Sequence, residues 1–296
     1  MIDDAHQNTE FSLHKPLIRQ GFARIVGHYD EAAVLQREVG ERMLERLELV
    51  KLDPAVVVDI GCGTGAALPG LLSRYRQARV LALDLVPAML LRARRRRHWW
   101  RRPGLLCGDA ESLPLADGSC DLLFCNMVLP WCDLESTLGE FRRVLKPNGL
   151  LLFSTLGPDT LVELRSAWRQ VDDQVHINAF LDMHDIGDAL VRSGLAEPVM
   201  DTERLTLTYR NLADLLRDIR HSGAGNATAG RPRGLMGRAR RHALEHHCEQ
   251  GRREGVLPIT AEVVYGHAWG PTAPVTRRRQ DGVATVPVSS IRRRRP

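Results

Sequence analysis

A glycine-rich turn after an apolar run constrains the fold of this 296-residue chain more than any other feature. The run AVVVDI at 55–60 predicts a buried strand, GCGTG follows it at 61–65, and residues 64–75 have the pattern of a helix. Glycines at such a turn let the backbone bend tightly and let a ligand approach where a Cβ would collide. The segment therefore predicts a nucleotide-binding α/β unit.

The rest of the chain alternates expected strands with expected helices, which implies a parallel sheet covered by helices on both faces. Apolar residues at helical spacing from Gly21 to Leu49 predict one or two helices before the first strand. The expected fold is an α/β, Rossmann-like, seven-stranded sheet with an N-terminal helical cap and a helical insertion before the last strand. Strands are expected at 55–60, 78–84, 104–109, 120–126, 149–156, 203–209 and 260–265, with a short one at 286–288, and later helices at 87–97, 134–145, 160–171, 183–193, 212–221 and 236–250.

We divide the chain by these patterns into four parts. Residues 1–50 form the cap, 51–157 the nucleotide-binding core, and 158–270 the rest of the same domain with the insertion and the closing strands. Residues 271–296 are rich in Pro, Thr and Arg and are expected to be a basic, flexible tail.

Composition and charge narrow the class of protein. No apolar run approaches the roughly 18–20 residues that cross a bilayer, and the N-terminus has no basic start followed by an apolar stretch, so we expect a soluble, cytoplasmic protein without a membrane partner. The six cysteines have no paired CxxC spacing, and the histidines at 242, 246 and 247 have no matching carboxylate, so no metal site is expected.

The net charge of +5 is unevenly distributed, because residues 92–102 include seven arginines. An acidic partner and a solvated helix face are both open explanations.

Acidic residues at strand ends indicate which nucleotide is bound. Asp84 ends the second expected strand, where a carboxylate can accept both ribose hydroxyls. Asp109 ends the third, where its side chain and the Ala110 backbone can meet an adenine. Asp59 would crowd a pyrophosphate but suits a cationic amino group, and the turn lacks the GxGxxG spacing of nicotinamide dinucleotide sites. These residues favour S-adenosylmethionine.

The segments DIGCGTG, LALD, GDAESLP and CDLLFCN resemble the signature of the seven-strand S-adenosylmethionine-dependent methyltransferases over residues 10–157. In such enzymes the N-terminal helix folds over the cofactor. The resemblance implies a set of cofactor-binding residues: Tyr29, Asp59, Gly61, Gly63, Gly65, Asp84, Leu85, Asp109, Ala110 and Asn126.

Further segments resemble one family within that superfamily, the biotin-pathway malonyl-[acyl-carrier protein] O-methyltransferases. They include GFARIVGHYDEAAVLQREVGERML (21–44), NMVLPWC (126–132), FSTLGPDTLVELRSAW (153–168), VHINAFLDMHDIGDAL (175–190), GAGNATAGRPRGL (223–235) and AEVVYGHAWGP (261–271). The resemblance implies methylation of the free carboxylate of a malonyl thioester on acyl carrier protein or coenzyme A, which primes pimeloyl synthesis for biotin.

For the acceptor we consider polar and aromatic residues in the family-like segments. We expect no catalytic base, because a malonyl carboxylate is already ionised at neutral pH, and we expect one Arg contact with one or two neutral donors. A quinone-type C- or O-methyltransferase and an RNA methyltransferase remain alternatives, although no RNA-binding fold is appended and nucleic acid is not expected as a partner. The candidate substrate-binding residues are Trp131, Arg165, His176, Asn178 and Arg231.

Overall fold

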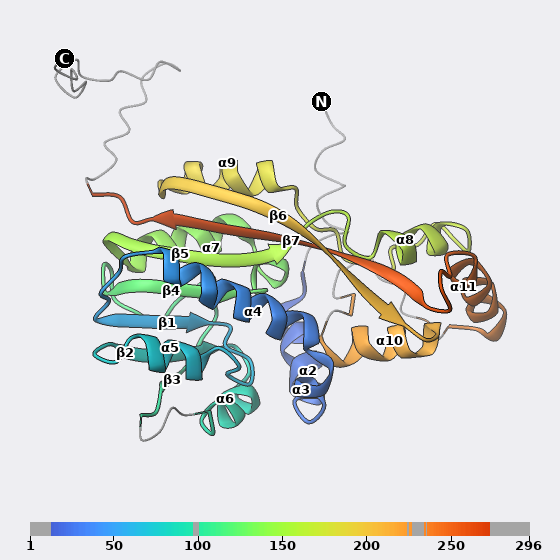
Figure 1. The fold of residues 1–296 in the computed structure, drawn as a ribbon, viewed down its shortest axis with the longest axis horizontal. Coiled ribbons are helices and arrows are strands. Elements are labelled where there is room, and N and C mark those ends of the chain that lie inside the picture. Colours follow the sequence, from blue (N-terminus) through green and yellow to red (C-terminus); the bar gives the residue numbers. More distant parts are fainter. Residues whose placement is uncertain (1–12, 97–100, 224, 227–233, 235, 273–296) are drawn as a thin grey trace, which may run out of the picture.

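A computed structural model describes residues 13–96, 101–223, 225–226, 234 and 236–272 of the chain. Seven strands form one sheet in the order β3-β2-β1-β4-β5-β7-β6 (Figure 1). The strands are β1 Val56–Ile60, β2 Arg79–Asp84, β3 Gly104–Cys107, β4 Cys120–Asn126, β5 Leu145–Leu156, β6 Ala196–Tyr209 and β7 Leu257–Trp269.

The sheet is mixed rather than parallel throughout. The strands from β3 to β5 pair in parallel, as expected for strands joined by helices. By contrast, β7 lies between β5 and β6 and runs antiparallel to both. Since β6 is antiparallel to β7, it points in the same direction as β1 to β5. The expectation of a parallel sheet is therefore wrong for one strand, β7.

Helices cover both faces of the sheet and generate two apolar cores. Met43, Leu71 and Leu90 pack against Val57 on one face, whereas Phe141 and Leu190 pack on the other. The helices are α2 Lys15–Ile25, α3 Tyr29–Ala32, α4 Val34–Arg46, α5 Leu68–Arg74, α6 Pro87–Ala93, α7 Leu134–Val144, α8 Val162–Arg169, α9 Met183–Ser193, α10 Leu212–His221 and α11 Arg238–Gln250, with 3-10 turns at Leu47–Leu49 and Leu129–Trp131.

The cap and the insertion meet at one end of the sheet. Strands β6 and β7 extend past the other strands to reach α8, α10 and α11 (Figure 1). Leu164, Trp168, Leu215 and Leu244 form a third apolar core there. On the cap side, His28 stacks on His221 with ring centroids 5.2 Å apart. The insertion therefore contacts the N-terminal helices.

Several expected boundaries are corrected. The helix expected at 64–75 begins only at Leu68, because the glycine turn occupies its first residues. The helix expected at 134–145 ends at Val144, and β5 begins at once instead of at residue 149. Strand β3 ends at Cys107, so Asp109 lies in the following loop. The strand expected at 286–288 lies outside the described residues.

Strands β6 and β7 contain 14 and 13 residues and are about twice as long as expected. In β6, half-buried and exposed residues alternate, and the exposed positions include Glu197 and Thr206. An edge strand with one solvated face has no continuous apolar run to mark its length.

Among the described residues, no helix has the length and apolar character needed to cross a bilayer.

Candidate functional site

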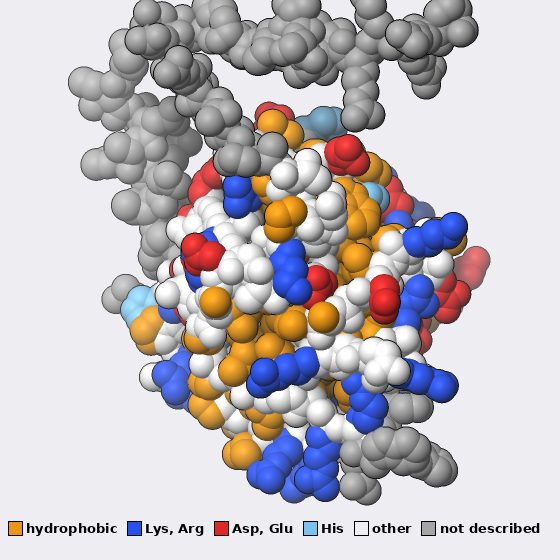
Figure 2. Space-filling model, turned by 90° about the vertical axis from the view of Figure 1, so that its left-hand side faces the viewer, with side chains coloured by type: hydrophobic (Ala, Val, Ile, Leu, Met, Phe, Trp, Pro, Cys, Tyr) orange, Lys and Arg blue, Asp and Glu red, His pale blue; other side chains and the backbone are white. Residues whose placement is uncertain are grey.

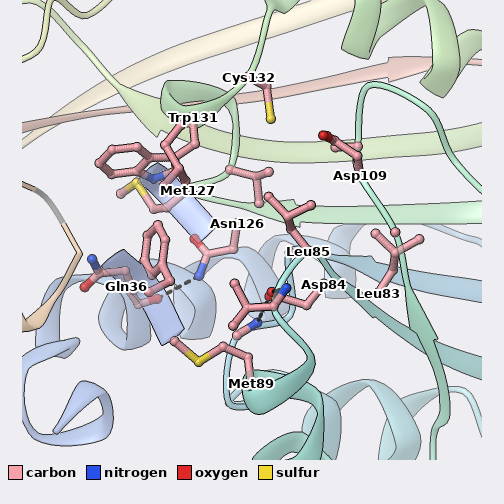
Figure 3. Close-up of a pocket in the computed structure, with 18 of the residues that line it drawn as sticks. Gln36, Leu83, Asp84, Leu85, Met89, Asp109, Asn126, Met127, Trp131 and Cys132 are labelled. Carbon is pink, nitrogen blue, oxygen red and sulfur yellow. Dashed lines mark hydrogen bonds between the residues drawn. The ribbon is translucent and has the colours of Figure 1, made fainter. Parts of the chain in front are cut away.

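A cavity opens at the carboxyl ends of the central parallel strands, and residues of α2 and α4 also line it. Figure 3 shows the side chains around it. Such a position is where α/β sheets bind nucleotides. A second cavity adjoins it and shares Tyr29, Gln36, Gly61 and Asn126. Eight of the expected cofactor residues line the first cavity: Tyr29, Gly61, Gly63, Asp84, Leu85, Asp109, Ala110 and Asn126.

The glycine turn adopts the backbone that its sequence predicts. Gly61, Gly63 and Gly65 have φ of 63°, 53° and 83°, which side chains rarely tolerate. A Cβ on Gly61 would lie 2.3 Å from the Val128 side chain. Gly65 does not line either cavity, and a Cβ there would lie 3.1 Å from the Ala93 backbone. Gly65 thus lets the turn pack on α6.

Asp84 fixes the turn from the end of β2. Its Oδ2 accepts the Gly63 N–H at 2.8 Å, and its Oδ1 accepts the Val86 N–H at 2.8 Å. Burial raises the pKa of this carboxyl, although the two backbone donors act against that rise. Each carboxylate oxygen still has a free lone pair, so the residue can also accept hydroxyl donors from the cavity.

Asp59 is more deeply buried than Asp84. It is 2% exposed, and its Oδ2 has no hydrogen-bond partner in the part of the chain that the structure describes. Burial, together with the nearby charge of Asp84, raises its pKa well above the ordinary value. A buried carboxylate without a partner is costly, and a cationic ligand group would relieve that cost. Asp59 lines the second cavity, which therefore fits the cationic amino group of S-adenosylmethionine.

Asp109 lies beside the first cavity in the loop after β3. Its Oδ1 accepts the Glu111 N–H and the Lys15 ammonium, the latter at 2.7 Å, and Lys15 also lies 2.9 Å from Glu111 Oε1. The ligand atoms of Asp109, Glu111 and Cys132 lie within 4.8 Å of one another, a spacing that could hold a metal ion. The Lys15 ammonium, 3.7 Å from the Cys132 Sγ, already supplies a positive charge to this cluster.

Aromatic rings form one wall of the first cavity. The Phe22 ring meets the Tyr29 ring edge to face at 6.3 Å between centroids and the Trp131 ring at 5.5 Å. Burial, together with the charges of Asp84 and Asp30, raises the pKa of Tyr29. Burial raises the pKa of Cys132 to about 11. Both groups are therefore protonated at neutral pH.

Asn126 ties β4 to the cap. Its Nδ2 donates to the Gln36 backbone oxygen at 2.8 Å (Figure 3). Its Oδ1 accepts the Ser154 hydroxyl at 2.7 Å. Gly40 leaves room for this contact, because a Cβ there would lie 3.0 Å from Asn126 Nδ2. Sequence reasoning did not select Lys15 or Gln36. Each is a lone polar residue in an amphipathic helix, which carries no local signal of a site.

The candidate substrate residues divide between two places. Trp131 lines the first cavity, whereas Arg165, His176 and Asn178 line a separate cavity beside α8 that shares no residue with the first. His176 stacks on Trp168 with centroids 3.5 Å apart and lies 2.7 Å from Asp172. The Arg165 guanidinium donates to the backbone oxygens of Pro158 and Thr160. Arg231 lies outside the described residues.

Among the described residues of the 92–102 run, Arg96 and Arg101 have partners within the chain. Arg101 donates to the carbonyls of Leu72, Tyr75 and Ala78 at the end of α5, and Arg96 pairs with Asp30. By contrast, Arg94, Arg95 and Arg102 line a shallow hollow with Leu91. Figure 2 shows Lys and Arg side chains gathered along the lower edge of the face at the amino ends of the parallel strands.

Comparisons with known proteins agree with this fold. A model of the methyltransferase domain matches residues 58–153. The structure of YcgJ from Bacillus subtilis superposes with a TM-score of 0.53 at 15% identity, covering 78% of this chain and 99% of that one. A putative methyltransferase from Bacillus halodurans also has a TM-score of 0.53, at 17% identity, covering 77% and 97%. At these identities the two structures support the fold alone.

Two curated relatives are similar over nearly their whole length. Malonyl-[acyl-carrier protein] O-methyltransferase of Gallionella capsiferriformans is 50% identical over 95% of this chain and 98% of its own. The protein of the same name from Methylovorus sp. is 50% identical over 93% and 95%.

The fold, the acidic strand ends and the domain match define an S-adenosylmethionine-dependent methyltransferase. More particularly, the chain belongs to the malonyl-[acyl-carrier protein] O-methyltransferase family.

Proposed function

We propose that this enzyme methylates the free carboxylate of a malonyl group held as a thioester on acyl carrier protein, giving the methyl ester that primes pimeloyl synthesis for biotin. The observation that carries the proposal is the similarity to a relative of that name over 95% of this chain and 98% of the relative. The bound cofactor supplies an electrophilic methyl group on a sulfonium.

For the cofactor, we assign polar groups of the two cavities to three parts of the ligand: the adenine, the ribose and the amino group. The Asp109 carboxylate accepts a hydrogen bond from the adenine, and the Ala110 backbone N–H donates one to it. Asp84 accepts hydrogen bonds from the ribose hydroxyls, and Asp59 accepts one from the amino group. Leu85 and the glycine turn provide close apolar and backbone contact. The carboxylates at the ends of β1 and β2 support this assignment, because burial holds both in place.

We assign binding of the acceptor carboxylate to the aromatic wall formed by Phe22, Tyr29 and Trp131. Tyr29 and Trp131 present a hydroxyl and an indole N–H, which are neutral donors able to orient a carboxylate. No arginine lines the first cavity among the described residues, so the expected Arg contact is not found there. Neutral donors leave the carboxylate oxygen more nucleophilic than a paired guanidinium would. Substrate roles for Arg165, His176, Asn178 and Arg231 stay predictions.

Catalysis then depends on alignment of the carboxylate with the methyl group rather than on a base. No histidine lines the first cavity in the described chain, and Tyr29 and Cys132 both have raised pKa values. The walls exclude water and hold the acceptor in line.

Parallel assays with labelled cofactor test the substrate class. Malonyl-carrier protein, malonyl coenzyme A, acetyl-carrier protein, a quinol and bulk RNA are offered at equal concentration. We expect label on malonyl-carrier protein and none on acetyl-carrier protein, which lacks the free carboxylate. Labelling of RNA or quinol in preference to both malonyl thioesters would contradict the proposal.

A further inference from the structure

The ammonium group of the cofactor requires more than one acceptor. An ammonium has three N–H donors, and Asp59 Oδ2 is a buried acceptor that has no hydrogen-bond partner among the described residues. The inference below rests on the cofactor assignment made above and concerns which further side chain completes this site.

A second acceptor without a partner lies in the same place. Gln36 Oε1 is buried and, like Asp59 Oδ2, has no hydrogen-bond partner among the described residues. Leaving such an oxygen unsatisfied in the protein interior is unfavourable. Gln36 and Asp59 both line the second cavity, and Gln36 also lines the first.

The position of Gln36 is fixed from two sides. It lies in the first turn of α4, where its backbone oxygen accepts the Asn126 amide (Figure 3). Its Nε2 donates to the Ser222 carbonyl at 3.5 Å, at the end of α10. Because the amide nitrogen is directed to Ser222, the amide oxygen is the atom left for a ligand.

We propose that Gln36 Oε1 accepts a hydrogen bond from the amino group of S-adenosylmethionine, beside the Asp59 carboxyl group. A neutral amide provides this acceptor without adding a third negative charge to the neighbouring Asp59 and Asp84 carboxylates, whose pKa values are already raised by burial. Gln36 is thus a cofactor-binding residue contributed by the cap.

Calorimetric binding of two ligands to the full chain tests this proposal. S-adenosylhomocysteine carries the amino group, whereas 5′-methylthioadenosine lacks the amino-acid part. We expect Gln36→Leu to weaken S-adenosylhomocysteine about 10-fold and methylthioadenosine less than about 2-fold, on the scale of one lost charge-assisted hydrogen bond. Gln20→Leu, at an exposed position of α2, is the matched control and should leave the affinity for both ligands unchanged.

A second variant distinguishes the amino group from the ligand carboxylate. Gln36→Glu retains acceptor oxygens and should bind S-adenosylhomocysteine more tightly than Gln36→Leu does. If Gln36 instead donated to the ligand carboxylate, the Glu variant would bind more weakly than the Leu variant, and the proposal would be wrong. Equal losses for both ligands, or no loss in Gln36→Leu, would also overturn it. Failure of the wild-type chain to bind S-adenosylhomocysteine would instead refute the cofactor assignment.

Discussion

In the cofactor assignment that we propose, the buried Asp59 side chain selects the ligand. Its carboxylate lies at the end of β1, next to the turn where a dinucleotide site would hold a pyrophosphate. A second negative charge there would be strongly repelled, whereas an ammonium satisfies the oxygen that lacks a partner. The choice between two nucleotide classes thus depends on a single charge.

The raised pKa of Asp59 makes cofactor binding depend on pH. Protonation removes the charge that the ammonium requires, so affinity is complete above the raised pKa and is lost as pH falls through it. We expect S-adenosylhomocysteine to bind up to about 10-fold more weakly per pH unit below that pKa. Calorimetry with methylthioadenosine separates out any contribution from Asp84, since that ligand lacks the amino group. An identical pH dependence for both ligands would contradict the role of Asp59.

Substitutions at the turn test the ribose assignment. Asp84→Asn should weaken S-adenosylmethionine at least about 10-fold, because it removes the carboxylate that holds the Gly63 and Val86 N–H groups and accepts hydroxyls. Gly63→Val should do the same, since Gly63 has φ of 53° and its Cβ position faces the Tyr29 ring at 3.5 Å. Gly118→Val is the control for backbone strain, having φ of 55° and open space around it. Wild-type affinity in the two test variants would refute the assignment.

The carboxylates at the strand ends could be predicted from the sequence, because each follows an apolar strand run within a short motif. Contacts between residues that are distant in the sequence could not be predicted in this way. Lys15 meets Asp109 across 94 positions of the chain, and Gln36 is directed by Ser222, 186 positions away. The expected grouping of Arg165 and His176 with Trp131 was not found, because their places depend on how α8 packs in the third core.

Part of the arginine run at 92–102 has a structural role, and Arg101 shows it. Its guanidinium donates to three carbonyls at and beyond the end of α5, groups that have no partner within the helix. We expect Arg101→Ala to lower the free energy of unfolding by about 1–3 kcal/mol, measured by urea denaturation. Arg102→Ala, at an exposed neighbour, is the matched control and should change it by less than about 0.5 kcal/mol. Equal effects would show that Arg101 has no special role.

Lys15 anchors the start of α2 to the loop after β3. We expect Lys15→Met to increase hydrogen exchange in α2, because the ion pairs to Asp109 and Glu111 are lost and two carboxylates are left adjacent. Arg19→Met, one turn further along the helix, should leave exchange unchanged, since Arg19 is exposed. Unaltered exchange in the Lys15 variant would mean that apolar packing of Ile18 alone holds the helix.

The elements themselves were predicted unevenly. Apolar strands such as β1 and β4 were located to within a residue, because both of their faces are buried. The antiparallel direction of β7 was not predicted, since direction depends on how the insertion returns the chain to the sheet.

For the whole molecule, we propose that exposed arginines of the cap and the insertion, such as Arg19, Arg24 and Arg220, attract the acidic carrier protein. The Debye length falls from about 10 Å at 0.1 M to about 3 Å at 1 M ionic strength. We therefore expect kcat/KM on malonyl-carrier protein to fall with added salt, while that on a small malonyl thioester changes little. Equal salt dependence for both substrates would contradict electrostatic docking.

Whether the methyl group goes to the malonyl carboxylate is measured by tandem mass spectrometry of malonyl-carrier protein after incubation with the enzyme and S-adenosylmethionine. We expect one added methyl per malonyl group, located on its terminal carboxylate as an ester, and no addition to the unacylated carrier. A methyl located on the protein, on the malonyl α-carbon or on no part of the substrate would contradict this expectation.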